Sequence, residues 1–171
     1  MTVSIGAPAV EGDTQFTQAW TWLNKEGPAN ASGIIDTVKI YATTGAEGDL
    51  VGCFVGIFYV VSGDTLKCRS AVEIGAVEGG AERTFPGLSL AVEAGDFIGL
   101  YFSDGSIRYR NSAGAGLWHS NAEVNHCVVD DQFEYTPLVG TYQLSINGTG
   151  EEVAVGGGMG GPANLIAAGI I

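Results

Sequence analysis

The residues best suited to metal or acid–base chemistry gather in one segment late in the chain. Two histidines and three carboxylates fall within it: His119, Glu123, His126, Asp130 and Asp131. All five could bind a divalent ion, but neither histidine has the spacing of a zinc site, and the EF-hand and RTX calcium patterns are absent. The segment reads as irregular, so the spacing does not fix where these side chains point. We therefore expect neither a metal nor another cofactor.

Covalent catalysis has less support in the sequence. The chain lacks the Gly-x-Ser-x-Gly elbow of one class of serine hydrolases, and the glycine-rich run at 156–161 is not followed by the Gly-Lys-Ser/Thr of a P-loop. The three cysteines, Cys53, Cys68 and Cys127, have no CxxC spacing, which favours buried free thiols. A catalytic pair of carboxylates, as in glycosidases, stays an open alternative, because the distance between two carboxylates depends on the three-dimensional structure. We expect that the protein is not an enzyme.

Tryptophan and tyrosine provide candidates for carbohydrate binding. Trp20 and Trp22 precede a loop at 24–32, and Trp118 and Tyr109 lie in later segments. An aromatic ring with a free face can form a platform for a sugar. No polar side chains converge on the two early tryptophans in the sequence, so burial in the core or at a subunit contact is the favoured alternative.

The most apolar stretch, Leu50–Val61, predicts a central β-strand. It is too short to cross a membrane as a helix, which takes about 20 residues. Cys53, Val55 and Ile57 share one face of this strand, whereas Phe54 and Phe58 share the other. Because both faces are apolar, we expect the core to cover one and another protein to cover the other. Phe54 and Phe58 are therefore candidate subunit contacts.

Turn chemistry divides the remaining chain into short strands. The Gly-Asp turn at 62–65 predicts a hairpin with a return strand, and the Asp-Gly turn at 103–106 predicts a second hairpin that brings Arg108 near Tyr101. Arg108 and Arg110 then either pack on tyrosine rings, which is favoured, or recognise a carboxylate. The predicted strands, besides the central one, are Phe16–Leu23, Gly33–Ala42, Leu66–Ala76, Leu88–Val92, Phe97–Phe102, Ile107–Asn111, Leu117–Ser120 and Thr141–Ile146.

These strands predict an all-β protein, an antiparallel β-sandwich of jelly-roll type with extended arms at both ends. We expect an N-terminal arm at 1–15, the sandwich at 16–149, and a glycine-rich linker with an apolar tail at 150–171. The tail sequence ANLIAAGII contributes further candidate subunit contacts, Leu165, Ile166, Ile170 and Ile171. It either docks on a neighbouring subunit or scaffold, or folds back on its own sandwich; the glycine-rich linker favours docking.

Composition limits the partners. The 171 residues carry a net charge of −12, with seven Lys and Arg against nineteen Asp and Glu, which argues against nucleic acid and anionic membranes. Charged residues make up only 15% and hydrophobic residues 46%, a balance that favours burial of part of the surface against other subunits. The first residues lack the basic and apolar regions of a secretory signal, so we expect synthesis in a cytoplasm.

Several of these segments together resemble a β-sandwich module of tailed-bacteriophage virion proteins. The resemblance rests on Val38–Ala42, Gly56–Phe58, Cys68–Val77, Phe85–Tyr101 and Trp118. It implies a jelly-roll-like virion structural protein of the capsid decoration or cement, head-fibre or tail-appendage type, often a homotrimer. The partner would be the major capsid protein or another virion protein, and the location the virion. The alternative is a carbohydrate-binding module of a phage tail or head fibre.

Overall fold

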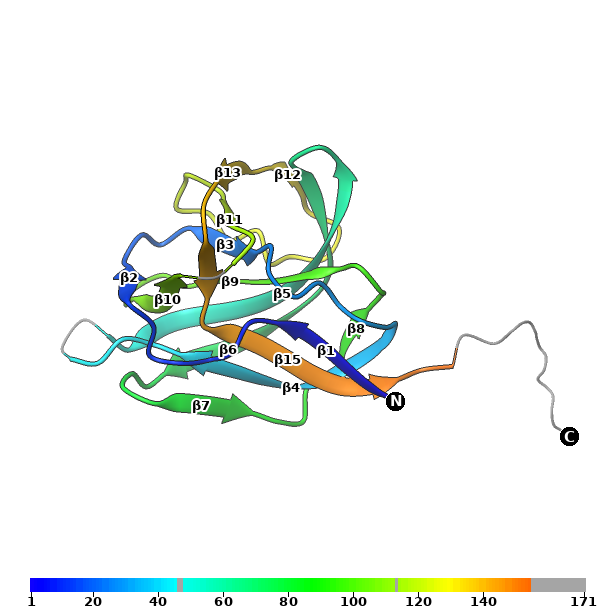
Figure 1. The fold of residues 1–171 in the computed structure, drawn as a ribbon, viewed down its shortest axis with the longest axis horizontal. Coiled ribbons are helices and arrows are strands. Elements are labelled where there is room, and N and C mark those ends of the chain that lie inside the picture. The colour runs from blue at the N-terminus through cyan, green and yellow to red at the C-terminus, as the bar shows by residue number, and fades with distance from the viewer. Residues whose placement is uncertain (46–47, 113, 155–171) are drawn as a thin grey trace, which may run out of the picture.

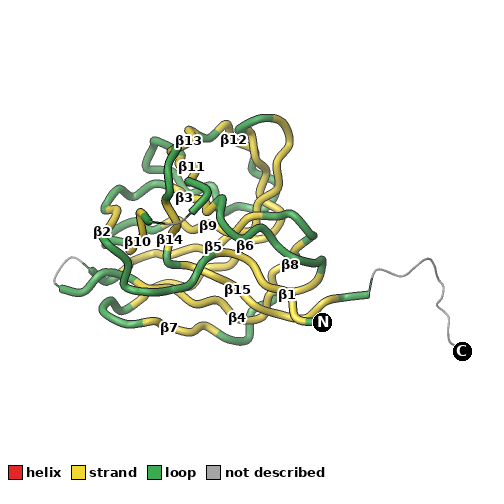
Figure 2. The backbone as a smooth tube through the Cα atoms, viewed as in Figure 1, coloured by secondary structure: helices red, strands yellow, loops and turns green. Residues whose placement is uncertain are grey.

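The computed structural model describes residues 1–45, 48–112 and 114–154 and is all-β, with only antiparallel sheets (Figure 1 and Figure 2). Among these residues no helix is long and apolar enough to span a membrane. The strands are β1 Thr2–Gly6, β2 Thr14–Phe16, β3 Thr21–Asn24, β4 Gly33–Tyr41, β5 Leu50–Ser62, β6 Thr65–Val77, β7 Glu82–Phe85, β8 Leu90–Val92, β9 Phe97–Tyr101, β10 Ile107–Asn111, β11 Leu117–His119, β12 Gln132–Glu134, β13 Thr136–Leu138, β14 Tyr142–Leu144 and β15 Ile146–Glu152.

Two large sheets form the sandwich. The front sheet has the order β1-β15-β4-β7, with β8 also paired to β4, and the long sheet has the order β12-β6-β5-β9-β3-β11-β13. A small third sheet, β14-β10-β2, closes one side. The predicted antiparallel β-sandwich is therefore confirmed.

The central strand and its hairpin agree with the sequence pattern. β5 pairs with β6 along its length, and Ser62 lies opposite Thr65 across the turn. Gly63 has a φ of 58°, the left-handed conformation that this short connection requires and that glycine adopts without strain. The alternation of side chains also holds, because Cys53, Val55 and Ile57 lie in one hydrophobic cluster and Phe58 in another.

The first core fills the space between the front and long sheets. Alternate residues of the strands on both sides point into it, as the period of two requires. Its fully buried members include Val3, Ile35, Val38, Ile40, Leu50, Val55, Ile57, Ile98, Leu100, Phe102, Ile107, Leu144 and Ile146.

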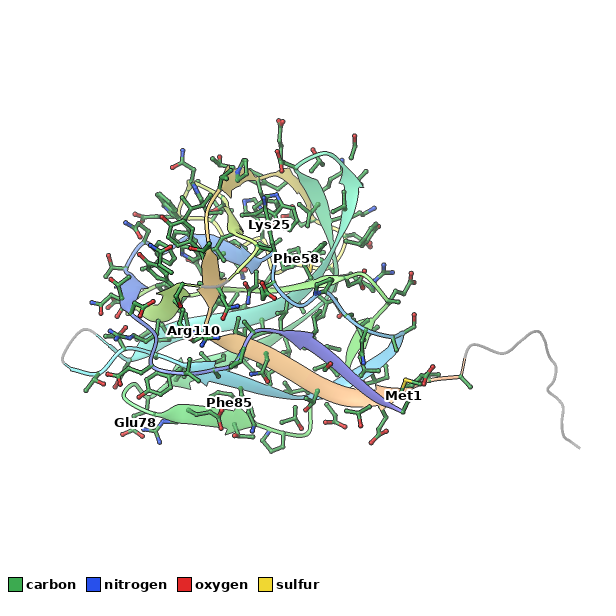
Figure 3. All side chains as sticks on the ribbon, viewed as in Figure 1. Met1, Lys25, Phe58, Glu78, Phe85 and Arg110 are labelled. Carbon is green, nitrogen blue, oxygen red and sulfur yellow. The ribbon has the colours of Figure 1, made fainter. Side chains whose placement is uncertain are left out.

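A second core lies on the opposite face of the long sheet, and this corrects one expectation. Phe58 is 0% exposed and Phe54 is partly buried, both against residues of the same chain, so Phe58 is not a surface for another subunit. The buried members of this cluster are Leu23, Phe58, Leu66, Cys68, Trp118, Cys127 and Tyr135. The sequence did not predict that this face of β5 is covered within the chain, because the covering residues come from short strands and loops beyond residue 117. Figure 3 shows Phe58 in this upper part of the molecule.

The long sheet nearly closes on itself. Its two outermost strands, β12 and β13, are separated in sequence by Tyr135 alone, and Tyr135 is buried in the second core. Neither of these two strands was predicted from the sequence. Strands of three residues are too short to show an alternation of apolar and polar residues. They form because β12 pairs with β6 and β13 pairs with β11.

The expected N-terminal arm is part of the sandwich instead. β1 pairs with β15, and Val3 and Ile5 belong to the first core. The outer edge of β1 is covered, because the side chain of Asn30 accepts a hydrogen bond from the Ser4 amide and Gly27 accepts one from the Gly6 amide. Such cover blocks further strand pairing at this edge.

The predicted strand Thr141–Ile146 is wrong, because its residues belong to two strands in different sheets: β14 lies in the small sheet, and β15 begins at Ile146 in the front sheet. β15 lies between β1 and β4, and its ladder continues to Glu152. A Cβ atom at Gly148 would lie 2.8 Å from a methyl group of Ile35, so the glycine serves close packing in the core rather than a turn.

The second predicted hairpin is wrong. β10 pairs with β14 and β2, not with β9, so Arg108 does not lie opposite Tyr101. The chain leaves the long sheet after β9. Isolated β-bridges then pair Asp104 with Val51 and Ile107 with Ala42. The Asp-Gly signal is local and specifies a reversal without specifying which strands pair.

Candidate functional site

The histidine and carboxylate segment does not assemble into one site. His126 is buried, and its Nδ1 lies 2.6 Å from Oδ2 of Asp131, an acceptor that places the proton on Nδ1. The ring packs on Phe133 with the centroids 4.0 Å apart. His119 is in another environment, stacked on Trp20 at 4.9 Å. Within the described ranges, no group of three or more His, Cys, Asp and Glu side chains is placed to hold a metal ion.

The three cysteines are free and buried, as predicted. Burial raises the pKa of the Cys68 thiol to about 12 and also raises the pKa values of Cys53 and Cys127. A thiolate is the reactive form of cysteine, so these side chains are weak nucleophiles at neutral pH and act as small apolar packing groups.

Three of the four aromatic candidates lie in a continuous row of stacked rings. Trp20 stacks on Trp22 at 5.3 Å between centroids, Trp22 stacks on Phe16 at 4.0 Å, and Phe16 stacks on Tyr109 at 4.0 Å. The His119 ring packs against both Trp20 and Trp22. The sequence did not reveal Phe16 and His119 as members, because the row is assembled by strand pairs of distant segments, β2 with β10 and β3 with β11.

This arrangement does not favour a sugar platform. A sugar stacks on a free ring face, whereas the faces of Trp22 and Phe16 are covered by neighbouring rings, and Trp22 is only 2% exposed. The fourth candidate, Trp118, lies apart in the second core and is 6% exposed. Its Nε1 donates to Oδ1 of Asp64 at 2.8 Å, and Lys25 lies over its ring.

The arginines of β10 are engaged within the chain. Arg108 donates to the carbonyl oxygens of Glu11 and Gly12, and Arg110 donates to the side-chain oxygen of Gln143. They fasten the segment before β2 and the strand β14 to β10. These contacts replace both the predicted packing on Tyr101 and the alternative of an unoccupied carboxylate receptor.

A third arginine, which the sequence did not single out, fixes the turn before β9. Arg69 holds Asp96 through two hydrogen bonds of 2.6 and 3.2 Å and also pairs with Glu93 at 2.9 Å. Asp96 is buried and accepts the amide of Glu93 as well. The acidic partners raise the pKa of Arg69, and the contact stabilises a turn rather than forming a site.

An open groove of about 360 Å³ lies at the outer side of the front sheet. Its lining is formed by residues 4–10, Lys39, Glu82 and residues 147–149. Lys39 and Glu82 form an ion pair at 3.4 Å, so the charged part of the lining is neutral. The first wall is apolar and small, with Ala7, Pro8, Ala9 and Val10 in sequence. The groove therefore suits uncharged, aliphatic groups.

The candidate contacts Leu165, Ile166, Ile170 and Ile171 lie outside the described residues. The described chain ends at Ala154, beside the N-terminus, because the Glu152 amide donates to the carbonyl of Met1 at 3.0 Å (Figure 1). The last described residues therefore lie close to the first one.

Comparison with known proteins adds no assignment to this geometry: the chain matches no family model, no curated protein and no solved structure.

Proposed function

We propose that the protein is a non-enzymatic virion structural protein that decorates or cements a bacteriophage capsid through contacts with the major capsid protein or another virion protein. The observation that carries the proposal is the neutral, apolar groove on the outside of a sandwich whose two cores are complete within one chain. A contact surface of this kind serves association with protein rather than a reaction.

The surface outside the groove fits the same role. Outside the groove and apart from Met1, the large hydrophobic side chains that are exposed in the described ranges are all valines: Val51, Val60, Val61, Val124, Val128, Val129, Val139 and Val153. Short aliphatic side chains can be covered by a neighbour without a large loss of side-chain entropy. They support a surface that is shared with other subunits.

The distribution of cations supports a protein partner rather than a nucleic acid. Lys39, Arg69 and Arg83 pair with carboxylates of the same chain, and Arg108 and Arg110 bind oxygen atoms of neighbouring segments. Phosphate neutralisation needs clustered cations that are available to the nucleic acid. In this chain most cations are already engaged, and the net charge is −12.

The test is to locate the protein on particles. Antibody raised against residues 1–154, coupled to gold, is applied to purified tailed-phage particles from the lysate in which the gene is expressed. We expect label at repeated positions on the head, and the same particles treated with pre-immune serum serve as the control. Particles that lack the protein by immunoblot and electron microscopy would overturn the proposal, and label confined to tail fibres would move it to the tail.

A further inference from the structure

The groove and the last described residues lie at opposite ends of the same strand. Residues 147–149 line the groove at the start of β15, whereas residue 154 follows the end of that strand. A strand rises about 3.3 Å per residue, so about 20 Å separates them. Since β15 runs away from the groove, the last described residue lies at the end of the strand that is farther from it. One copy therefore presents an acceptor at one end and begins a donor segment at the other.

The donor sequence matches the lining of the acceptor. Residues 163–171, ANLIAAGII, have no charged side chain and carry four large aliphatic ones, Leu165, Ile166, Ile170 and Ile171. The groove offers small apolar residues and a neutralised ion pair. Its volume of about 360 Å³ is near the lower end for ligand pockets, so it would take a few aliphatic side chains rather than the whole segment.

The intervening sequence is long enough to join two copies. Residues 155–162 include five glycines. A glycine-rich segment of this length spans about 15 Å on average and at most about 26 Å. This reach brings residues 163–171 onto a neighbour that abuts the end of β15.

We propose that residues 163–171 of one copy dock in the groove of a second copy of the chain, head to tail. Donor and acceptor are different surfaces, so each copy gives one contact and receives one, and repetition by rotation closes a ring of two or more copies. This inference names a second copy of the chain as the partner of the groove. For the role of the ring it rests on the proposed function.

The first experiment compares the mass of four full-length proteins by light scattering after gel filtration. The unchanged chain is expected to form a ring whose mass is a whole multiple, two or more, of the monomer mass. Ile166→Asp with Ile170→Asp places charge in the donor, and Thr149→Trp fills the groove; both are expected to be monomeric. Thr84→Trp is the matched control, since Thr84 is exposed on the front sheet but does not line the groove, and it should keep the ring.

The second experiment mixes the two monomeric variants. The Thr149→Trp protein keeps a normal tail, and the Ile166→Asp, Ile170→Asp protein keeps a normal groove. We expect them to form a one-to-one complex when mixed, although neither associates alone. Ser4→Trp, which changes another lining residue, should behave as Thr149→Trp does and guards against a local folding defect.

The outcomes separate the possible occupants. A monomeric unchanged chain, whether its groove is empty or holds its own tail, overturns the proposal. A ring that survives Thr149→Trp and Ser4→Trp, or a mixture that does not associate, also overturns it. None of these results changes the particle-labelling result, so failure of the ring and failure of the virion role are distinguishable.

Discussion

Asn24 shows how a single buried side chain joins two sheets. It is 0% exposed. Its side-chain NH₂ group donates to the backbone carbonyl of Leu144 at 3.1 Å, and its side-chain oxygen accepts from the backbone amide of Leu144 at 3.4 Å. Leu144 belongs to the small sheet and Asn24 to the long sheet. No propensity rule would assign this role, because the partner is 120 residues away in sequence.

Replacement of Asn24 by alanine should therefore be costly. It leaves two buried backbone groups without partners, and we expect a loss of about 2–4 kcal/mol in the free energy of unfolding, measured by urea denaturation. Asn30→Ala is the matched control. Asn30 makes a similar pair of bonds to Ser4 and Thr2, but at an exposed edge where water can replace it, so we expect a loss of about 1 kcal/mol or less. Equal losses in the two variants would contradict the assignment.

His119 makes stability depend on pH. Burial lowers its pKa below the usual value of 6.5, and its Nδ1 is buried without a hydrogen-bond partner in the described part of the chain. The unfolded chain therefore takes up a proton as the pH falls through about 6.5, whereas the native chain does so only at lower pH. Stability from this group is complete above pH 6.5 and is lost as the pH falls below it.

The variant His119→Phe keeps a ring in the stack but removes the titration. We expect thermal denaturation between pH 7.5 and 5.5 to show a smaller decrease in Tm for the variant than for the unchanged protein. Carboxylates titrate mainly below this window and are common to both proteins. Parallel pH profiles would show that His119 is not the responsible group.

The thiols provide a simple probe of the two cores. With the pKa of Cys68 raised to about 12, and with Cys53 and Cys127 buried, we expect no reaction with Ellman's reagent at pH 8 in the native protein. In 6 M guanidinium chloride all three should react. Rapid modification of one thiol in the native state would show that its core opens under native conditions.

At the scale of elements, the cover of the second core depends on β3. Thr21 is buried, and its hydroxyl donates to the carbonyl of Val124 at 2.8 Å and accepts from the amide of His126 at 3.0 Å. Its own amide donates to the hydroxyl of Ser120. These bonds attach an irregular segment to a regular strand, so the segment needs no secondary structure of its own.

Thr21→Val keeps the shape of the side chain but removes its hydrogen bonds. We expect the free energy of local opening at 120–127 to fall by about 1–3 kcal/mol, measured by native-state hydrogen exchange, with little change at β5. Thr84→Val, at an exposed position of β7, is the matched control and should leave exchange at 120–127 unchanged. Uniform faster exchange over the whole chain would indicate global destabilisation instead.

The sequence predicted the long strands better than the short ones. The run Leu50–Val61 specified β5, its two faces and its hairpin, because alternation and turn chemistry are local properties. β12 and β13 have three residues each and exist through their partners. Covering of Phe58 could not be predicted for the same reason, since the cover is made by contacts between segments far apart in sequence.

At the scale of the whole molecule, the described residues already form two hydrophobic cores. Among these residues, every buried member of the two clusters lies between Val3 and Ile146. We therefore expect residues 1–154 to unfold cooperatively, with a free energy of unfolding within about 1 kcal/mol of that of the full chain at low protein concentration. Urea denaturation followed by tryptophan fluorescence measures this, and loss of the cooperative transition would contradict it.

The contact between Met1 and Glu152 has a practical consequence. A domain whose two ends touch can be grafted into an exposed loop of a carrier protein through two short spacers, without separating the carrier's own flanking residues. The same proximity permits circular permutation: a few residues can join 152 to 1, and new ends can be opened in the exposed turn at Gly63. The sandwich is therefore a practical scaffold for display.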